Sequence, residues 1–412
     1  MTTDVPAPSE SATYSQLLHA PGVPWLFAMS LANVLGHSLQ IFALSVLIYR
    51  QTGSAAWSSL AFAAGFLPQL VGGTSLTSLA DRWPARPVLA ASAAIRAAVA
   101  SLLALGDLSP GVSIGMVALF AMWQPVPQAV QSALVTRLLT GDLYVLGRSV
   151  FSLISSGSQL LGLALGGAVI AALGPSSTFL VAAAVHLLGM LASLAIPSRG
   201  TAERPEGRWR LGETWSGNLR LLRNHAVRRI LLSWWVPITL LVGAEALVVA
   251  YVGERGGSSA QTGVLLAAFP AGAAVGDVVV GRWLSPGLRR RVVPWLYTLV
   301  GVALLPLVWY PGTIATVTCF AVASAATAYQ LGSQQAFLDA APVDRRGLAF
   351  GLFGTGLMVG QGLGPVAAGA LADVVGSGAT MTVLGTTVLV SAVFLARLPR
   401  IPHAAPDGRP LA

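Results

Sequence analysis

The chain is poor in charge, contains no lysine and has a single cysteine. Charged residues make up 9% of its 412 residues, whereas a soluble globular protein has about 25%. One cysteine, Cys319, excludes an intramolecular disulfide framework and a thiolate metal site. No cluster of His, Cys and carboxylates has ligand spacing, and no Walker loop is present. We therefore expect no metal, no cofactor and no direct use of ATP.

Apolar residues, in contrast, form 55% of the chain and gather in long runs. Each of twelve runs is close to the length of about 20 residues that a helix needs to cross a bilayer. The runs cover residues 25–49, 56–78, 87–105, 112–134, 149–173, 177–196, 230–251, 262–280, 292–309, 313–331, 348–371 and 380–395. This pattern predicts an all-α membrane protein with twelve transmembrane helices, embedded in a lipid bilayer.

All 24 basic residues are arginine, and their placement predicts the orientation of the chain. Only Arg50 and Arg255 lie in loops that follow odd-numbered runs, and Arg96 lies inside a run. The other 24 − 3 = 21 lie in the remaining loops or the C-terminal tail. Arginine collects on the cytoplasmic side of membrane proteins. We therefore predict a multi-pass cell membrane protein with both termini in the cytoplasm, and we do not read the net charge of +9 as a nucleic-acid footprint.

A polar stretch with eight arginines, residues 198–229, divides the runs into two sets of six. We predict an N-terminal tail at 1–24, a bundle at 25–197, a linker at 198–229, a bundle at 230–396 and a tail at 397–412. The first 24 residues contain no arginine or lysine and therefore differ from a signal peptide. Apolar residues at helical spacing in the linker favour an interfacial helix over a disordered linker; they are Leu211, Trp215, Leu219 and Leu222.

A short charged turn appears once in each half of the chain. The first contains Asp81, Arg82 and Arg86, and the second contains Asp277 and Arg282. Both include an Arg-Trp pair, and the two pairs are 282 − 82 = 200 positions apart. Two such turns between membrane-length runs indicate an internally duplicated transporter. The alternative is that each is an ordinary solvated turn.

The first turn resembles the signature loop of the major facilitator superfamily, Gly-x-Leu-Ala-Asp-Arg-x-Gly-Arg-Arg. The matching residues are Leu79, Ala80, Asp81, Arg82 and Arg86, whereas Thr77, Pro84 and Ala85 depart from the pattern. The resemblance implies two pseudo-symmetric six-helix bundles that alternate between opposite openings. It also implies a gating role for the loop, and for Asp277 and Arg282 in the second copy.

Few ionisable residues lie within the runs, and a charge there is costly enough to favour a functional role. Glu245 has apolar residues on both sides, so we expect it to bind and release a proton; a fixed polar contact between helices is the alternative. His37 is a second candidate for proton exchange, since a free imidazole has a pKa of about 6.5. Arg96 is a candidate counter-charge to a carboxylate. A hydrogen bond between helices is the alternative for His37 and the role that we favour for His186.

Glycines at small-xxx-small spacing predict close helix contacts in the fifth and eleventh runs. The residues are Gly162, Gly166, Gly167, Gly360, Gly364 and Pro365. They resemble the antiporter motif of the superfamily, a glycine-rich run that ends in Gly-Pro and then Gly-Gly. The fifth run has the Gly-Gly pair but lacks the proline, so ordinary glycine packing is the alternative.

Residues 127–146 and 344–347 resemble the drug-exporting and siderophore-exporting branches of the superfamily. This resemblance implies proton-coupled efflux of a small amphipathic compound (a drug, secondary metabolite or siderophore), and we expect a monomer. An importer or facilitator with the same fold, or a receptor or assembly protein that transports nothing, are the alternatives. Residues 111–115 match Gly-x-Ser-x-Gly, but this motif needs a strand, a turn and a helix with a nearby His and acid. It begins an apolar run here, so we predict no enzyme.

Overall fold

The computed structural model describes residues 13–75, 83–197, 218–342 and 346–397, and within these ranges the chain is helical without strands. Helices follow the apolar runs because a segment inside a bilayer has to satisfy its backbone hydrogen bonds internally. The helices of the N-terminal half are α1 (Tyr14–His19), α2 (Val23–Thr52), α3 (Ala55–Ala63), α4 (Leu67–Ser75), α5 (Ala85–Leu105), α6 (Pro110–Trp123), α7 (Pro125–Leu138) and α8 (Gly141–Ala195).

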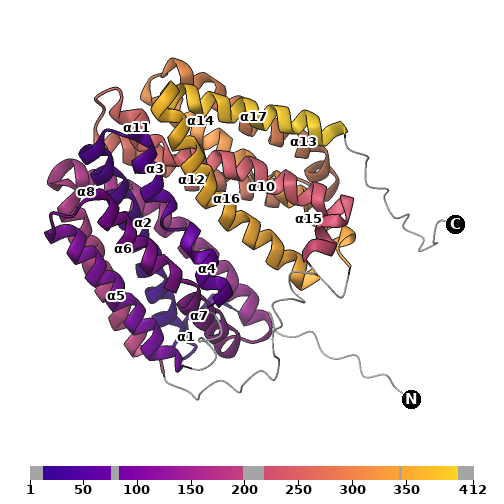
Figure 1. Ribbon diagram of the computed structural model, residues 1–412. Helices are drawn as coiled ribbons and strands as arrows, with labels where there is room; N and C mark the ends of the chain where they lie inside the picture. Colours follow the sequence, from indigo (N-terminus) through magenta and orange to yellow (C-terminus); the bar gives the residue numbers. More distant parts are fainter. Residues whose placement is uncertain (1–12, 76–82, 198–217, 343–345, 398–412) are drawn as a thin grey trace, which may run out of the picture.

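The C-terminal half repeats this pattern of long and interrupted helices (Figure 1). Its elements are α10 (His225–Ala246), α11 (Val248–Gly253), α12 (Ser259–Val278), the π-helix η2 (Val279–Trp283), α13 (Pro286–Leu304), the 3-10 helix η3 (Leu305–Trp309), α14 (Thr313–Ala326), α15 (Tyr329–Ala340), α16 (Arg346–Val375) and α17 (Ser377–Arg397). The fourth span is interrupted in both halves (α6–α7 and α14–α15), whereas the first span is continuous as α2 and its counterpart is divided into α10 and α11.

Ten helices among the described residues are long and apolar enough to cross a membrane. One of them, Asp142–Ala195, reverses at Gly174 and therefore supplies two crossings. Gly174 has φ 83 and ψ 173, a conformation that glycine adopts readily and other residues rarely adopt, and Pro175 follows it. The pair α6 and α7 adds a further crossing that is interrupted at Gln124. The sum, 10 + 1 + 1 = 12, confirms the predicted all-α membrane fold.

Several helix ends differ from the predicted runs because side chains cap them. In α10 the Asn224 carboxamide oxygen accepts hydrogen bonds from the backbone N–H groups of Ala226 and Val227, so the helix begins at His225 and not at residue 230. The predicted N-terminal tail contains α1, which a reciprocal cap between Thr13 and Gln16 begins.

The predicted linker helix is described only from residue 218 onward, where residues 218–223 are helical. Leu221 is buried there and Leu219 is exposed. Leu211 and Trp215 lie outside the described residues.

The two halves share one apolar core at one end of the molecule and have separate cores at the other. The shared core joins Phe42 and Leu44 of α2 to Leu247, Leu266 and Phe269 of the C-terminal half. Separate cores lie farther away, one within each half. Figure 1 shows the halves together where α3 and α11 lie and diverging towards α7 and α15.

We call the end with the shared core the odd-loop face, because the loops that follow odd-numbered spans meet there. The opposite end is the even-loop face. The odd loops are at residues 53–54, 106–109, 174, 254–258, 310–312 and 376.

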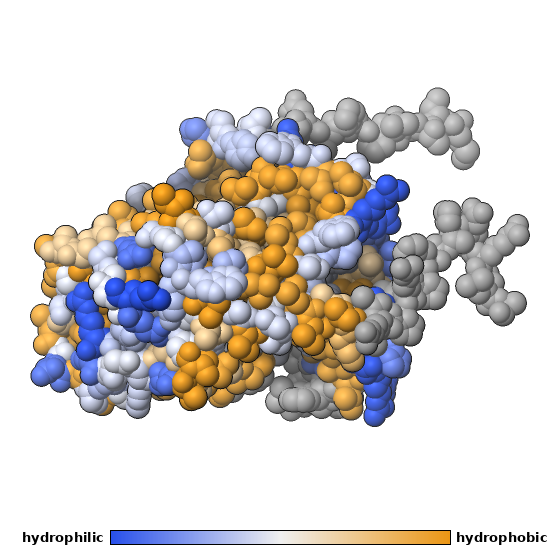
Figure 2. Space-filling view, turned by 90° about the horizontal axis from the view of Figure 1, so that it is seen from above, coloured by the Kyte–Doolittle hydropathy of each residue, from blue (hydrophilic) through white to orange (hydrophobic). Residues whose placement is uncertain are grey.

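The exposed surface fits a bilayer. Leu119, Leu153 and Ile314 are 71%, 68% and 85% exposed, as lipid-facing residues are in the absence of lipid. Figure 2 shows hydrophobic residues over much of one side, with the most hydrophilic ones gathered towards two opposite ends. Exposed tryptophans lie near both ends of the spans, as in the aromatic belts of membrane proteins; they are Trp57 and Trp309 near the odd-loop face, and Trp25, Trp83, Trp283 and Trp295 near the even-loop face.

Candidate functional site

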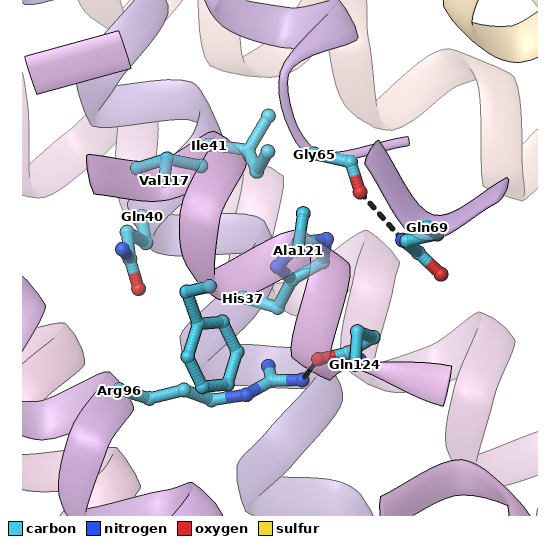
Figure 3. Close-up of a pocket in the computed structure, with 10 residues that line it drawn as sticks. His37, Gln40, Ile41, Gly65, Gln69, Arg96, Val117, Ala121 and Gln124 are labelled. Atoms are coloured by element: carbon cyan, nitrogen blue, oxygen red, sulfur yellow. Dashed lines mark hydrogen bonds between the residues drawn. The ribbon is translucent and has the colours of Figure 1, made fainter. Parts of the chain in front are cut away.

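A polar pocket lies inside the N-terminal half, between α2, α5, α6 and the break that separates α3 from α4. It is lined by His37, Gln40, Ile41, Gly65, Gln69, Arg96, Val117, Phe120, Ala121 and Gln124. Figure 3 shows the side chains of Arg96, Gln124 and His37 converging on this space from three segments of the chain. The pocket therefore unites two of the residues that the sequence singled out, His37 and Arg96, with three glutamines that it did not.

Arg96 is 6% exposed and lies near the middle of α5. Its Nη2 atom donates a hydrogen bond to Oε1 of Gln124. Its guanidinium carbon lies 5.0 Å from the centroid of the Phe120 ring, within the range of a cation–π contact. Among the described residues that line the pocket there is no Asp or Glu. The partners of this buried cation are thus an amide and an aromatic ring, and the predicted pairing with a carboxylate stays a prediction.

Interruptions of the spans place the amides around Arg96. Gln124 occupies the break between α6 and α7, where Pro125 supplies no backbone N–H. Gln69 follows the α3–α4 break, and its Nε2 donates to the Gly65 carbonyl at 2.5 Å. Gln40 is 7% exposed on α2. Three neutral amides thus line the same pocket as one fixed positive charge.

The two candidate histidines occupy different environments. His37 lines the pocket from α2. His186, on the second half of α8, is fully buried, and neither of its ring nitrogens has a hydrogen-bond partner among the described residues. A Cβ atom on Gly36 would lie 2.6 Å from Cε1 of His186. The glycine thus makes room for the ring, and the interhelical hydrogen bond favoured for His186 stays a prediction.

Glu245 lies in the last turns of α10, just before the interruption at Leu247. It is half-buried, and its neighbours Ala244 and Ala246 are buried. No described residue donates a hydrogen bond to its carboxylate. This carboxyl group therefore lies among apolar residues, close to the shared core and away from the residues that line the Arg96 pocket.

Asp373 joins the two halves at the odd-loop face. Its Oδ1 accepts hydrogen bonds from the backbone N–H groups of Ala55 and Ala56 at 2.7 and 3.2 Å, and its Oδ2 accepts one from the Ser54 hydroxyl at 2.6 Å. Asp373 belongs to α16 and the three donors begin α3. A carboxylate suits the positive end of the helix dipole and the unpaired N–H groups of a first turn. A side chain of one half therefore caps a helix of the other.

A second bond joins the halves on the same face, where the Arg50 guanidinium donates to the Ser259 hydroxyl at 3.0 Å. Nearby, within the C-terminal half, Glu254 accepts hydrogen bonds from the Tyr310 hydroxyl at 2.5 Å and the Ser377 hydroxyl at 2.6 Å. Burial and the hydrogen bond to Glu254 raise the pKa of Tyr310, which therefore remains a donor. The odd-loop face is closed in this structure.

The predicted gating residues lie at the other end of the spans. Asp81 and Arg82 are outside the described residues. Arg86 is half-buried in the first turn of α5, and Asp277 and Arg282 are exposed. The contacts in the second turn come from Arg289, one of the three arginines that follow it in sequence: its Nε donates to the Leu284 carbonyl at 2.9 Å and its Nη2 donates to the Gly281 carbonyl.

Glycines lie at the close helix contacts, as their spacing predicts. A Cβ on Gly162 would lie 2.7 Å from the Cβ of Ser38, and one on Gly166 would lie 2.8 Å from the Phe42 ring. The backbones of Gly360 and Gly364 pack on Thr239 of α10, one turn apart on α16, which also contains Pro365. Across the two halves, a Cβ on Gly167 would lie 2.7 Å from the Cα of Gly263.

The sequence model of the Major Facilitator Superfamily matches residues 26–253 and, a second time, residues 244–411. The chain belongs to the major facilitator superfamily. Membership of this superfamily indicates a transporter and not an enzyme. Consistently, the Gly-x-Ser-x-Gly segment lies in α6, where Ser113 is buried in a helix and not placed at a strand-to-helix turn.

Solved structures of transporters share the fold. The nucleoside transporter NupG has a TM-score of 0.71 at 13% identity, covering 90% of this chain and 98% of that one. A POT family transporter in complex with 5-aminolevulinic acid has a TM-score of 0.69 at 12% identity, covering 94% and 97%. Another POT family structure, in complex with a thioalcohol-conjugated peptide, has a TM-score of 0.66 at 12% identity, covering 91% and 95%. No curated protein matches the chain in sequence. Identity this low supports the superfamily fold alone.

Proposed function

We propose that this protein is a secondary transporter that couples proton uptake to the efflux of a small amphipathic compound by alternating access. The observation that carries the coupling is Glu245, a half-buried carboxyl group with buried alanines on either side and no hydrogen-bond donor among the described residues. An ionised carboxylate is unfavourable in such surroundings unless it is paired. A proton on Glu245 therefore stabilises the state in which the odd-loop end is closed.

Opening of the odd-loop face then brings water to Glu245, because this residue lies near the shared core that holds the face shut. Water stabilises the ionised form, so the group binds or releases its proton when the molecule changes state. If the odd loops face outward, as the arginine placement predicts, Glu245 exchanges its proton with the outside when the odd-loop face opens. Net proton entry then requires that the proton leave towards the cytoplasm through the even-loop side after the odd-loop face has closed. Such a cycle drives export when proton and substrate bind alternately.

A pH-gradient assay in proteoliposomes tests the coupling. The vesicles contain a trapped pH-sensitive dye and the purified protein, and a panel of amphipathic compounds is screened for those that dissipate an imposed gradient. For such a compound, Glu245→Gln keeps the shape of the protonated acid but releases no proton. We expect proton movement to disappear while exchange of labelled for unlabelled compound continues.

The direction of compound movement relative to the gradient separates efflux from import. Coupling at the wild-type rate in Glu245→Gln would remove this residue from the mechanism and make His37 the next to test. Loss of both proton movement and exchange would instead assign Glu245 to substrate binding. Compound movement that is independent of pH would favour a facilitator, and no movement of any compound would favour a receptor or assembly protein.

A further inference from the structure

The charge in the N-terminal pocket points to a class of substrate. We infer that the Arg96 pocket binds a small amphipathic anion, with Arg96 holding its oxyanion group. This inference rests on the proposed function as a transporter of small compounds and adds the chemical class that the pocket selects.

The argument begins with the hydrogen bonds that Arg96 leaves unmade. A guanidinium group has five N–H donors in a planar fork, and among the described residues this one has a single hydrogen-bond acceptor, the Gln124 amide oxygen. The residue is 6% exposed near the middle of a membrane span, where an uncompensated cation is costly. An oxyanion supplies both the missing acceptors and the missing charge, and it matches the fork in two parallel bonds.

The rest of the pocket fits such a group without competing for Arg96. Gln40 and Gln69 reach the pocket from α2 and α4, and their amides are neutral. Gln69 uses Nε2 for the Gly65 carbonyl, and Gln40 makes no side-chain hydrogen bond to any described residue. The Gln40 amide is thus free to donate to an anion beside the guanidinium. A substrate cation, by contrast, meets the charge of Arg96 and finds no carboxylate among the described lining residues.

Apolar side chains complete the pocket and define the other half of the ligand. Ile41, Val117 and Ala121 line it, and the Phe120 ring lies 5.0 Å from the guanidinium carbon. The free space in this structure is about 20 Å³, which admits a small oxyanion group, so the pocket has to widen to take a body as large as a ring. An aromatic or aliphatic body then contacts these apolar side chains, which a hydrated inorganic anion does not.

Binding measurements on the purified full-length protein test this assignment without any proton gradient. The probes are 1-naphthoate, its neutral amide and 1-naphthylmethylammonium, which share one ring system and differ in charge. We expect 1-naphthoate to bind about tenfold or more tightly than either analogue, as a charge-assisted pair requires. Arg96→Gln removes this preference and Arg96→Lys keeps part of it. Arg290→Gln, a change at an exposed arginine of α13, leaves it intact.

Equal binding of the amide and the acid by the wild-type protein overturns the inference, and so does an undiminished preference in Arg96→Gln. Chloride or sulfate that competes with 1-naphthoate as strongly as unlabelled 1-naphthoate does also overturns it, since the apolar surface then contributes nothing. If Arg96→Gln does not fold, the comparison of the three probes on the wild-type protein still decides. The binding assay and the proton-movement assay test the two proposals separately. If 1-naphthoate shows no preferential binding, proton coupling through Glu245 is unaffected. If Glu245→Gln still couples protons, the anion preference of the Arg96 pocket is unaffected.

Discussion

Single glycines on α12 bring its backbone against the backbone of α14. A Cβ on Gly272 would collide with the Ala321 carbonyl oxygen, and one on Gly276 would collide with that of Ala325 one turn later. Because the obstacle is backbone, a neighbouring side chain cannot move aside to make room. The pair α12 and α14 therefore depends on the missing methyl groups at these two positions.

Gly272→Ala is accordingly expected to destabilise the protein by about 1–3 kcal/mol, as overpacking in a core does. The matched control is Gly115→Ala in α6, where an added Cβ meets nothing within 4 Å and the helix gains from alanine. Thermal unfolding of both variants in the same detergent measures the difference. An unchanged midpoint for Gly272→Ala would show that the two helices separate freely at this point.

Among single residues, sequence analysis identified the ionisable candidates but missed the neutral polar ones. His37, Arg96 and Glu245 stand out because ionisable residues are rare within apolar runs. Gln40, Gln69 and Gln124 do not stand out, since a glutamine in a span has many structural uses. Their meeting around Arg96 depends on the rotation and pairing of several helices, which one sequence does not specify. A polar residue directly before a proline in mid-span, as at Gln124, is the signal that was available.

Whole elements were predicted more reliably than their interruptions. Each apolar run became a helix or a pair of helices, because length and hydropathy alone decide whether a segment crosses a bilayer. The second span is interrupted at residues 64–66, just before Pro68, because in a continuous helix the proline ring would clash with the carbonyl four residues earlier. The break at Leu247 in the seventh span has no proline or glycine beside it and was not predicted. The cap between Asp373 and α3 was also missed, since its partners are 319 positions apart.

That cap leads to a prediction about how elements separate. Removing the carboxylate with Asp373→Ala leaves the first N–H groups of α3 without their cap, which costs about 0.5–2 kcal/mol, or roughly 2- to 30-fold in the population of the open state. The reporter is Ser59→Cys in a variant that lacks Cys319. Ser59 is fully buried, and a Cβ on Gly369 of α16 would lie 2.7 Å from its Cβ. We expect an impermeant thiol reagent to label this cysteine faster when Asp373 is replaced.

The control for that experiment is Glu254→Gln, which alters another carboxylate on the same face. Glu254 caps α17 through Ser377, inside the C-terminal half, and its hydrogen bonds to described residues all stay within that half. Its replacement should lower stability without changing the labelling rate of the cysteine at position 59. Equal rates for Asp373→Ala and the parent protein would assign closure of the odd-loop face to the shared apolar core alone.

The whole molecule combines one closed end with two halves that diverge towards the other (Figure 1). The inter-half bonds of Asp373 and Arg50, the contact of Gly167 with Gly263 and the shared core all lie at the odd-loop face. At the even-loop end each half has a core of its own. A gate at the even-loop end is the role predicted for the loop around Asp81 and Arg82. Closing that end while opening the odd-loop face would therefore break the contacts at the odd-loop face and form new contacts at the even-loop end.

Which of the two faces opens to the cytoplasm depends on the orientation of the chain in the membrane. Arginine placement predicts that the even-loop face is, because Arg50 and Arg255 are the only arginines in odd loops. Gly111 and Gly287 offer matched positions for testing this. Each follows a proline in the first turn of a helix, is exposed, and has nothing within 4 Å of an added Cβ. Gly256, in another odd loop, is less suitable because its φ of +65 disfavours a side chain.

With Cys319 removed, a cysteine at Gly111 should react with an impermeant thiol reagent in intact cells, and one at Gly287 should react only after the cells are opened. Because the two local structures match, a difference in labelling reports the side of the membrane and not the reactivity of the thiol. The opposite pattern would reverse the orientation, place the closed face towards the cytoplasm and turn the proposed proton entry at Glu245 into proton exit. Labelling of both in intact cells would show that the chain inserts in two orientations.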